Sequence, residues 1–503
     1  MSFTTLFGSK PNSAIRKRTS LLTPKPDVPT MTQFNFYGRK SELQTLSAFY
    51  ANASTNLGVI YGRRRVGKSL LIKESLKRSG LPFIYLECKQ TSEENNLRQL
   101  MSLLGLKLGI PPLAVDNFED AIDFLFKFCK SDATVLVFDE YPFLRDLIPG
   151  FDSILQALVD RYKGESKLKI ILCGSYIDIM KGILAYKSPL YGRSSFVMNL
   201  HPMDYYESAE FYASYSNEDK IKIYSALGGI PYYNSLIDPS ISVEENFIRL
   251  FLLPEAILSN EVTLFLAAEV SKVNNANLVL EALGQGARKY SDIATYTKLP
   301  ASSLASVLNQ LGSLDLISKD YPINAPDNLK KAQYVFRDNM VHFYYKYIYK
   351  NISHMGFMNP EKFYDLFIGP DLDTKHIPKQ FEAICREFLI RSNKLNRISP
   401  PFFKIGRYYY DIPKLKKNGE FDVVTEDQTG FTFYEVKCRN QPMTPAQIEA
   451  EIEQVNASPL KAIRYGFISK SGFKKAEYRN DLVLYDPKIS DFGAVDDEGK
   501  RSI

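Results

Sequence analysis

This chain of 503 residues lacks the cysteine and histidine patterns that mark several protein classes. Its five cysteines are odd in number and contain no C-x-x-C pair: Cys88, Cys129, Cys173, Cys385 and Cys438. The four histidines are equally dispersed, at His201, His342, His354 and His376. We therefore expect no disulfide framework, no cysteine zinc site and no histidine metal site. No apolar run reaches about 18 residues and no signal-peptide core is present, so we expect a cytoplasmic protein with reduced thiols.

The composition is that of a globular protein, with 45% hydrophobic and 24% charged residues. A chain of this length exceeds one hydrophobic core, and roughly three domains are expected. The 63 basic and 57 acidic side chains leave a net charge of +6. This mildly basic balance permits a nucleic-acid partner without requiring one.

A phosphate-binding loop is predicted at Gly62-Arg63-Arg64-Arg65-Val66-Gly67-Lys68-Ser69, which fits G-x-x-x-x-G-K-[ST] and follows the apolar run 57–61. In such a loop backbone N–H groups surround the phosphates, the lysine reaches the β- and γ-phosphates, and the hydroxyl ligates Mg²⁺. The helix expected over 70–78 directs its positive end at the same anion. The residues of this segment expected to bind ATP are Gly62, Arg65, Val66, Gly67, Lys68, Ser69 and Leu70. The alternative is a basic loop that happens to contain glycine.

A second nucleotide motif is predicted at 134–140, a buried apolar strand that ends in two acids. Because parallel sheets bind ligands at the carboxyl ends of their strands, Asp139 is expected to hold Mg²⁺ and Glu140 to polarise the attacking water. Further strands are expected at 82–88, 168–173 and 195–200, with helices between them. This alternation predicts a parallel sheet covered on both faces.

The predicted site also includes Ser175 and Arg193, which both follow the strand expected at 168–173. Ser175 brings a hydroxyl beside the γ-phosphate, and Arg193 can stabilise phosphoryl charge. For Arg193 a structural ion pair at the surface is the alternative.

Changes in composition and in hydrophobic periodicity divide the whole chain into seven segments. They are a disordered basic tail (1–34), an ATPase core (35–202), a helical lid (203–271), a winged helix (272–340), an aromatic helical linker (341–375), a third domain (376–487) and a tail (488–503). The alternative for 1–34 is a basic arm that touches nucleic acid. The helix that would read DNA, 300–306, has no Lys or Arg, which favours packing or relay over base reading. The aromatic and lysine-rich segment 343–350 favours core packing over stacking on single-stranded bases.

A second constellation is predicted on a hairpin of strands 419–424 and 431–437. Alternation places Glu435 and Lys437 on one face of their strand, with Asp422 on the partner strand. Asp422 and Glu435 can then bind Mg²⁺, while Lys437 orients or activates a water for phosphodiester hydrolysis. Glu382, on a preceding helix, can add a further acid. The alternative is a surface hairpin with a salt bridge.

The chain resembles the archaeal-type P-loop ATPases of the AAA+/STAND assemblage, with a C-terminal domain similar to the PD-(D/E)XK restriction-endonuclease fold. The residues that carry the resemblance are Phe36 to Arg39, Tyr61 to Ser69, Phe138 to Tyr141, Cys173 to Ser175, Pro189 to Arg193 and Gly229-Ile230-Pro231. It implies nucleotide binding by Gly67, Lys68 and Ser69, metal holding by Asp139, water activation by Glu140, γ-phosphate sensing by Ser175 and an arginine sensor or finger at Arg193. It also implies that Pro231 lies near the adenine and that the C-terminal domain has nuclease ancestry.

Two functions follow, and both use ATP and Mg²⁺. In the first, an ATPase is coupled to a nuclease-like domain that cuts or grips DNA. In the second, an ATP-driven signalling switch binds a protein partner, and the acids of the hairpin are a remnant. The sequence does not decide whether the protein is a homo-oligomer, although Arg193 can act in trans only between two chains.

Overall fold

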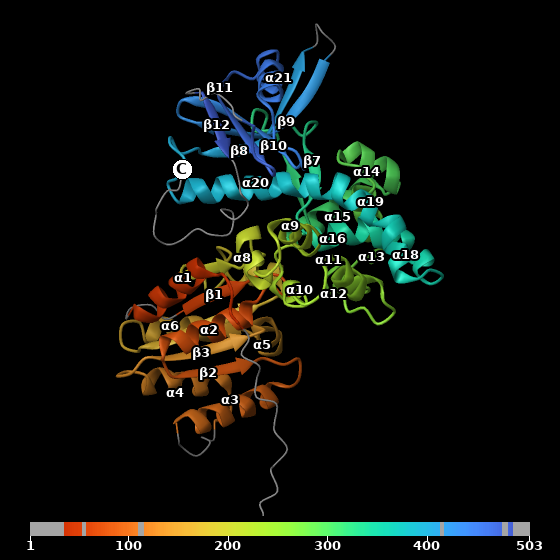
Figure 1. Cartoon of the computed structure of the whole chain (residues 1–503). Coiled ribbons are helices and arrows are strands. Elements are labelled where there is room, and N and C mark those ends of the chain that lie inside the picture. Colours follow the sequence, from red (N-terminus) through yellow and green to blue (C-terminus); the bar gives the residue numbers. More distant parts are fainter. Residues whose placement is uncertain (1–34, 53–56, 109–114, 413–416, 475–480, 486–503) are drawn as a thin grey trace, which may run out of the picture. The chain divides into compact units, whose positions relative to one another are not determined.

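The computed structural model describes residues 35–52, 57–108, 115–412, 417–474 and 481–485 (Figure 1). The tails predicted over 1–34 and 488–503 lie outside these residues. The chain up to Phe36 and the chain from Tyr37 onward form two units, and all the elements below belong to the second. None of the helices described here is long and apolar enough to cross a membrane. The five cysteines are free thiols, as expected.

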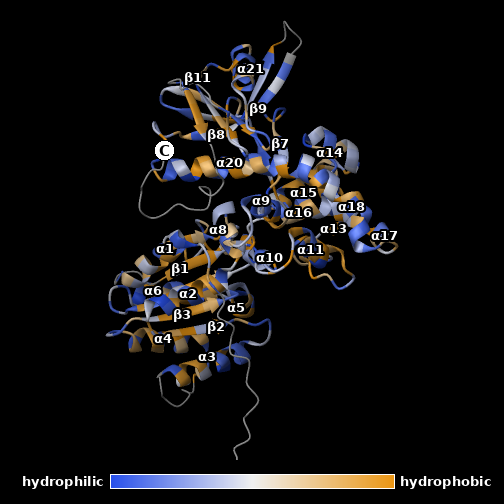
Figure 2. Ribbon diagram, in the orientation of Figure 1, coloured by the Kyte–Doolittle hydropathy of each residue, from blue (hydrophilic) through white to orange (hydrophobic). Residues whose placement is uncertain are grey.

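The first domain is built on a five-stranded sheet of β1 (Leu57–Tyr61), β2 (Phe83–Glu87), β3 (Thr134–Asp139), β4 (Leu168–Gly174) and β5 (Phe196–Asn199). All pairings are parallel, in the order β2-β3-β4-β1-β5. Every residue of β1, β3 and β4 is buried, and Figure 2 shows the hydrophobic character of β1 and β3. The predicted parallel α/β sheet is confirmed.

Helices before and between the strands pack against this sheet: α1 (Lys40–Ala51), α2 (Lys68–Ser79), α3 (Glu93–Leu108), α4 (Phe118–Phe128), α5 (Tyr141–Leu147), α6 (Phe151–Arg161) and α7 (Ile177–Gly182). In α4, Phe118, Ile122 and Leu125 recur at helical spacing and are buried in the core. Asn117 caps α4 by accepting a hydrogen bond from Asp120 N at 2.8 Å. Burial of each such side chain contributes about 1.5–3 kcal/mol, so the core fixes the strand ends that carry the site.

Short helices follow the sheet: α8 (Tyr205–Ala209), α9 (Asn217–Leu227), α10 (Pro231–Asn234), α11 (Val243–Phe247) and α12 (Glu261–Glu269). A tight approach joins them to the end of the sheet domain, where Met203 N donates to Gly229 O at 2.7 Å. A Cβ at Gly229 would lie 1.8 Å from Met203 O, so only glycine fits there.

The next segment has three helices and a hairpin: α13 (Val273–Gly284), α14 (Tyr290–Thr297), α15 (Ala301–Ser313), and the antiparallel strands β6 (Ile317–Asp320) and β7 (Gln333–Phe336). The assignment of this segment as a winged helix stays an interpretation.

The aromatic segment that follows is helical, with α16 (Asn339–Phe343), two π-helical turns (Tyr344–Ile348 and Leu372–His376), α17 (Ile352–Met355), α18 (Pro360–Phe367) and α19 (Gly369–Asp371). Tyr344, Tyr345 and Tyr347 are each at most 2% exposed. The preference for core packing over base stacking is thereby confirmed.

The C-terminal domain is a mixed sheet with two helices: α20 (Ile377–Lys394), β8 (Lys404–Ile412), β9 (Lys417–Asp427), β10 (Gly430–Lys437), α21 (Pro445–Asn456), β11 (Ala462–Ser469) and β12 (Leu482–Tyr485). Its order is β12-β11-β10-β9-β8, with β8, β9 and β10 antiparallel and β10, β11 and β12 parallel. Ile448, Ile452 and Val455 of α21 pack on Phe433 and Phe467 of the sheet. A capping box of Thr444 and Gln447 starts α21.

Candidate functional site

The phosphate loop joins β1 to α2 at the carboxyl end of the sheet. Gly62 follows β1, and a Cβ there would lie 2.4 Å from Leu200 O. Gly67, with a φ of 94°, caps α2 in the left-handed region that favours glycine. Both predicted glycines are therefore required by the close backbone path of the loop, and Leu70, which is 44% exposed, lies in the first turn of α2.

The Lys68 side chain is buried inside the turn of this loop, with 6% exposure. Its Nζ donates to Gly62 O at 2.8 Å and to Arg63 O at 3.0 Å. Burial lowers the pKa of the Lys68 ammonium, although Glu140 and Asp139 act in the opposite direction. A buried cation held by two carbonyl oxygens is well placed to exchange them for phosphate oxygens.

Ser69 and Asp139 lie side by side, with Ser69 Oγ donating to Asp139 Oδ2 at 2.7 Å. Tyr85, on the neighbouring strand β2, donates to the same carboxylate oxygen. A hydroxyl and a carboxylate are hard oxygen ligands of the kind that Mg²⁺ prefers. The pair fits the expected magnesium ion, and Tyr85 is a contributor that the sequence did not reveal.

Glu140 and Ser175 are also brought together. Ser175 Oγ donates to Glu140 Oε2 at 2.9 Å, and Ser175 N lies 3.3 Å from the same oxygen. Glu140 has a φ of 53°, a strained left-handed conformation at the start of α5. The predicted base and the predicted γ-phosphate sensor therefore meet at the ends of β3 and β4.

Two further groups enclose the loop. The ring of Pro231 lies 3.6 Å from the Cβ position of Gly67, so Pro231 is beside the phosphate loop. Arg39 is buried and donates to Val66 O at 3.1 Å and to His201 O at 2.8 Å. The role of Arg39 was not predicted, because its partners are distant in the sequence.

Arg193 is placed apart from these residues. Its guanidinium binds Asp160 of α6, with Nη2 at 2.8 Å from Oδ2. Ser195 N donates to Leu57 O at the first residue of β1, whereas the phosphate loop follows the last residue of that strand. Arg193 therefore lies at the opposite end of the sheet from the phosphate loop of its own chain.

The second predicted constellation gathers around β9 and β10. Tyr434 pairs with Val423, so Glu435 and Asp422 are the next residues along the two antiparallel strands. Lys437 forms salt bridges with Glu435 and with Glu451 of α21, the latter at 2.9 Å. Burial raises the pKa of Glu435, with Lys437 opposing and Asp422 adding to the rise. The three predicted residues thus form one electrostatic cluster.

Asp422 lies at an irregular position of its strand. Gly406 of β8 pairs with Val424 and Tyr408 with Phe421, so β9 has one extra residue between these pairs. Such a bulge re-aims a side chain and is common beside functional sites. Lys379 of α20 lies 3.3 Å from Asp422 Oδ1 and also pairs with Glu382. Within the described residues, no group of three or more His, Cys, Asp or Glu is placed to hold a metal ion.

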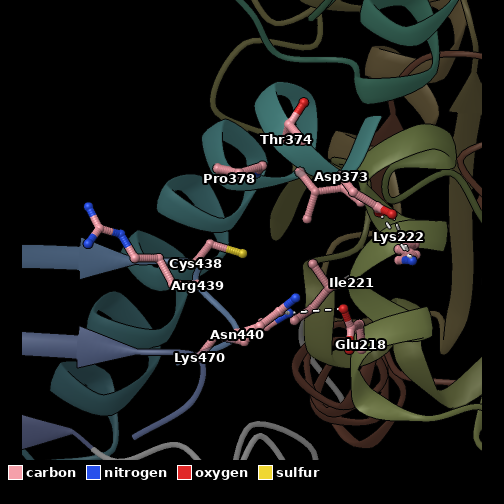
Figure 3. Close-up of a pocket in the computed structure, with 11 residues that line it drawn as sticks. Glu218, Ile221, Lys222, Asp373, Thr374, Pro378, Cys438, Arg439, Asn440 and Lys470 are labelled. Atoms are coloured by element: carbon pink, nitrogen blue, oxygen red, sulfur yellow. Dashed lines mark hydrogen bonds and ion pairs between the residues drawn. The ribbon is translucent and has the colours of Figure 1, made fainter. Parts of the chain in front are cut away.

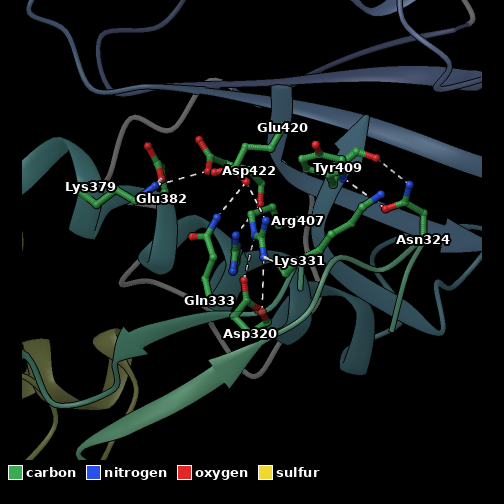
Figure 4. A network of polar contacts seen from close by, with 11 residues as sticks. Asp320, Asn324, Lys331, Gln333, Lys379, Glu382, Arg407, Tyr409, Glu420 and Asp422 are labelled. Carbon is green, nitrogen blue, oxygen red and sulfur yellow. Dashed lines mark hydrogen bonds and ion pairs between the residues drawn. The ribbon is translucent and has the colours of Figure 1, made fainter. Parts of the chain in front are cut away.

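A polar network joins this cluster to the β6–β7 hairpin (Figure 4). Arg407 of β8, only 4% exposed, donates to Glu420 at 2.6 Å and to Asp320 of β6 at 3.2 Å. Gln333 of β7 donates to the same carboxylate of Glu420 at 3.1 Å. Because Glu420 is two residues before Asp422, the hairpin is tied directly to the strand that carries the acid.

A cavity of about 360 Å³ opens beyond the carboxyl ends of β10 and β11 (Figure 3). Its charged lining residues are largely paired with one another: Lys470 lies 2.9 Å from Glu218, and Lys222 lies 3.1 Å from Asp373. It contains none of the predicted site residues.

The phosphate loop, the acids after β3 and the parallel order of the sheet define a P-loop ATPase of AAA+-like fold. Residues 36–236 match a model described as an ATPase domain predominantly from Archaea. Residues 344–453 match a second model, of archaeal and bacterial proteins of unknown function.

Two individual proteins and one solved structure are also similar to this chain. An uncharacterized protein of Methanocaldococcus jannaschii is 28% identical over 417 residues, which are 80% of this chain and 88% of the relative. An uncharacterized ATP-binding protein of the same organism is 40% identical over 53 residues, 10% of this chain and 90% of the relative. A Walker-type ATPase of Pyrococcus abyssi is similar in structure, with a TM-score of 0.48 and 20% identity over 64% of this chain and 99% of that one.

Proposed function

We propose that this P-loop ATPase is Mg²⁺-dependent and is coupled to a C-terminal nuclease-like site that acts on DNA. The observation that carries the second half of the proposal is the cluster of Asp422, Glu435 and Lys437 on two paired strands. Acids with an adjacent lysine are what metal-assisted phosphodiester hydrolysis requires.

In the ATPase site, Ser69 and Asp139 would hold Mg²⁺, which supplies charge neutralisation to the phosphates. Lys68 exchanges its carbonyl partners for phosphate oxygens, and Glu140 orients the water that attacks the γ-phosphate. Ser175 now bonds Glu140, so its hydroxyl can pass from Glu140 to the phosphate when nucleotide is present. The contacts around the loop and at the ends of β3 and β4 support these assignments.

In the C-terminal site, Asp422 and Glu435 would hold a divalent cation, which supplies a water of lowered pKa and charge for the scissile phosphate. Two carboxylates suffice for this, because Mg²⁺ commonly keeps several waters and takes substrate phosphate as a ligand. Lys437 is held by Glu435 and Glu451, so its ammonium is positioned to orient the water. Glu382 adds negative charge close to Asp422.

Coupling is supported by contacts that run between the two sites. Arg63 of the phosphate loop forms a buried salt bridge with Asp338, two residues after β7. At its other end β7 contributes Gln333 to the network around Glu420 and Arg407. Movement of the loop on ATP binding would therefore act on the strand that carries Asp422 through one hairpin.

The second candidate is an ATP-driven switch that binds a protein partner through the C-terminal domain. It is favoured by the fact that the acids already have cationic partners, Lys437 for Glu435 and Lys379 for Asp422. Under this candidate the cluster is a structural ion-pair network, and it cuts nothing.

The experiment that separates the candidates is cleavage of labelled single- and double-stranded DNA with Mg²⁺ or Mn²⁺. Lys437→Ala, Asp422→Asn and Glu435→Gln should each abolish cleavage, whereas Lys404→Ala, which removes an exposed ion pair on β8, should not. Wild-type protein that cleaves no DNA under any of these conditions would favour the switch.

A further inference from the structure

The phosphate loop carries three consecutive arginines, and α12 offers each of them a partner. Glu261, Phe265 and Glu269 are four residues apart and so share one face of α12. Arg65 forms a salt bridge with Glu261, the Arg63 guanidinium lies 4.8 Å from the centre of the Phe265 ring, and Arg64 Nε lies 3.1 Å from Glu269 Oε1.

Of the three arginines, Arg64 lies beside the catalytic groups. Its Nη2 donates at 3.0 Å to the hydroxyl of Tyr176, the residue after Ser175. Burial lowers the pKa of Lys68 and the nearby Arg64 charge lowers it further, which places the two cations close together. Burial raises the pKa of Glu269, with Arg64 opposing and Glu140 adding to the rise. Arg64 and its partner Glu269 therefore lie near enough to Lys68 and Glu140 to interact with them electrostatically.

The other arginines are committed elsewhere. Arg63 is 3% exposed and is held by Asp338. Arg65 lies 4.6 Å from the centre of the Tyr232 ring while it pairs with Glu261. Arg193 is at the other end of the sheet and binds Asp160. The Arg64 side chain is 41% exposed, about as much as that of Arg65 at 42%, so its guanidinium can change partners at low cost. Of these two, Arg64 is the one that bonds the residue after Ser175.

We infer that Arg64 is a catalytic arginine supplied by the chain's own phosphate loop, and that it leaves Glu269 for the γ-phosphate when ATP binds. This inference rests on the proposed hydrolysis of ATP. Water attacks the γ-phosphorus and gives up a proton to Glu140, the bond to the β–γ bridging oxygen breaks, and ADP and inorganic phosphate leave. Arg64 exchanges no atom in this step, and its guanidinium neutralises the charge on the transferred phosphoryl oxygens.

The test compares ATP turnover and ATP binding of full-length Arg64→Gln with those of Arg161→Gln, which removes an exposed ion pair on α6. Arg64→Gln should lower kcat on the order of 10³-fold and change the Kd of ATP by only a few-fold. Arg64→Lys keeps the charge and the pairing with Glu269 but lacks the planar fork, and it should lose kcat as well while remaining folded. Equal kcat in Arg64→Gln and Arg161→Gln would overturn the inference.

A mixing experiment then tests whether Arg64 acts within its own chain. Lys68→Ala chains carry an intact Arg64 and should bind no ATP, so an excess of them should not restore turnover to Arg64→Gln. Restored turnover would show that the arginine acts between chains and would contradict the inference. A wild-type protein that binds ATP but does not hydrolyse it would instead refute the hydrolysis, and the inference with it.

Discussion

Glu140 illustrates how a single residue is fixed by groups far from it in the sequence. Its carboxylate accepts the Ser175 hydroxyl, and its backbone adopts a left-handed conformation with a φ of 53°. Such a conformation costs about 1–3 kcal/mol in a residue other than glycine and persists only where surrounding structure enforces it. The strain is placed at the residue expected to handle the attacking water.

We predict that Glu140→Gln binds ATP with nearly unchanged affinity and loses turnover by about 10²- to 10⁴-fold, since an amide cannot act as a base. Lys68→Ala, in contrast, should lose ATP binding itself, because the buried ammonium is removed. Binding by fluorescent ATP analogue and phosphate release measure the two effects. Glu87→Gln, at the exposed end of the adjacent strand β2, is the control. Unchanged turnover in Glu140→Gln would refute its assigned role.

Among the elements, α12 places two carboxylates against the phosphate loop, Glu261 at Arg65 and Glu269 at Arg64. Glu269→Gln weakens the hold of α12 on Arg64 without altering the shape of the side chain. We expect the Kd of ATP to fall by about twofold to fivefold, the range that partly exposed ion pairs allow. Isothermal titration should show this fall in the wild-type background and none in Arg64→Gln. A fall of the same size in the exposed control Glu255→Gln would mean that the effect is one of net charge alone.

The β6–β7 hairpin is the second such element, because it contacts the C-terminal sheet. Asn324 in its loop donates to Tyr409 O at 2.7 Å, so the loop lies along β8, while Arg407 joins β6 to β9. These contacts favour the packing or relay role that the uncharged helix 300–306 suggested.

We predict that Arg407→Met destabilises the contact between the hairpin and the C-terminal sheet by on the order of 2 kcal/mol, because Asp320 and Glu420 lose a nearly buried partner but keep some access to water. Hydrogen exchange should quicken in β6, β7 and β8. Lys404→Met, an exposed pair on the same strand, should leave exchange in the hairpin unchanged. Equal protection in the two variants would contradict the prediction.

Across the whole molecule, the features that could be predicted from the sequence are those encoded by short runs of neighbouring residues. The phosphate loop, the acids after a buried strand and the alternation of Glu435 with Lys437 each occupy fewer than about ten neighbouring residues. The contacts that could not be predicted are salt bridges between distant segments: Arg63 with Asp338, Arg64 with Glu269, and Arg407 with Asp320. Side-chain partners of this kind depend on the packing of whole elements, which no local period encodes.

Glu387 of α20 makes the contact between the C-terminal part and the helical segment dependent on pH. It accepts Tyr205 N at 2.8 Å and the Tyr224 hydroxyl at 3.0 Å. Burial raises the pKa of the Glu387 carboxyl group from 4.5 to about 7, and the nearby Asp204 adds to the rise. The hydrogen bonds that Glu387 accepts from Tyr205 and Tyr224, together with the charge of Arg337, oppose the rise. Between these pKa values the folded chain binds one more proton than the unfolded chain, so stability falls as the pH rises from about 4.5 to about 7.

We therefore expect Glu387→Gln to remove this decline, because its amide does not titrate, while its oxygen can accept from Tyr205 N and its NH2 group can donate to the Tyr224 hydroxyl. Relative to the variant, the wild type should lose on the order of 2 kcal/mol of stability between pH 5 and pH 8, which follows from about 1.4 kcal/mol per pKa unit. Thermal unfolding midpoints across this range measure the difference, with the exposed Glu453→Gln as control. Parallel profiles for wild type and Glu387→Gln would refute the assignment.

In the proposed mechanism, nucleotide at the phosphate loop controls the acid cluster of the C-terminal sheet. The most direct measurement of this control is the rate of metal-dependent DNA cleavage with and without ATP, in wild type, Lys68→Ala and Lys437→Ala. We expect ATP to change the rate in the wild type and to leave it unchanged in Lys68→Ala, and we expect no cleavage in Lys437→Ala. Cleavage that survives in Lys437→Ala, or that responds to ATP equally in wild type and Lys68→Ala, would contradict this mechanism.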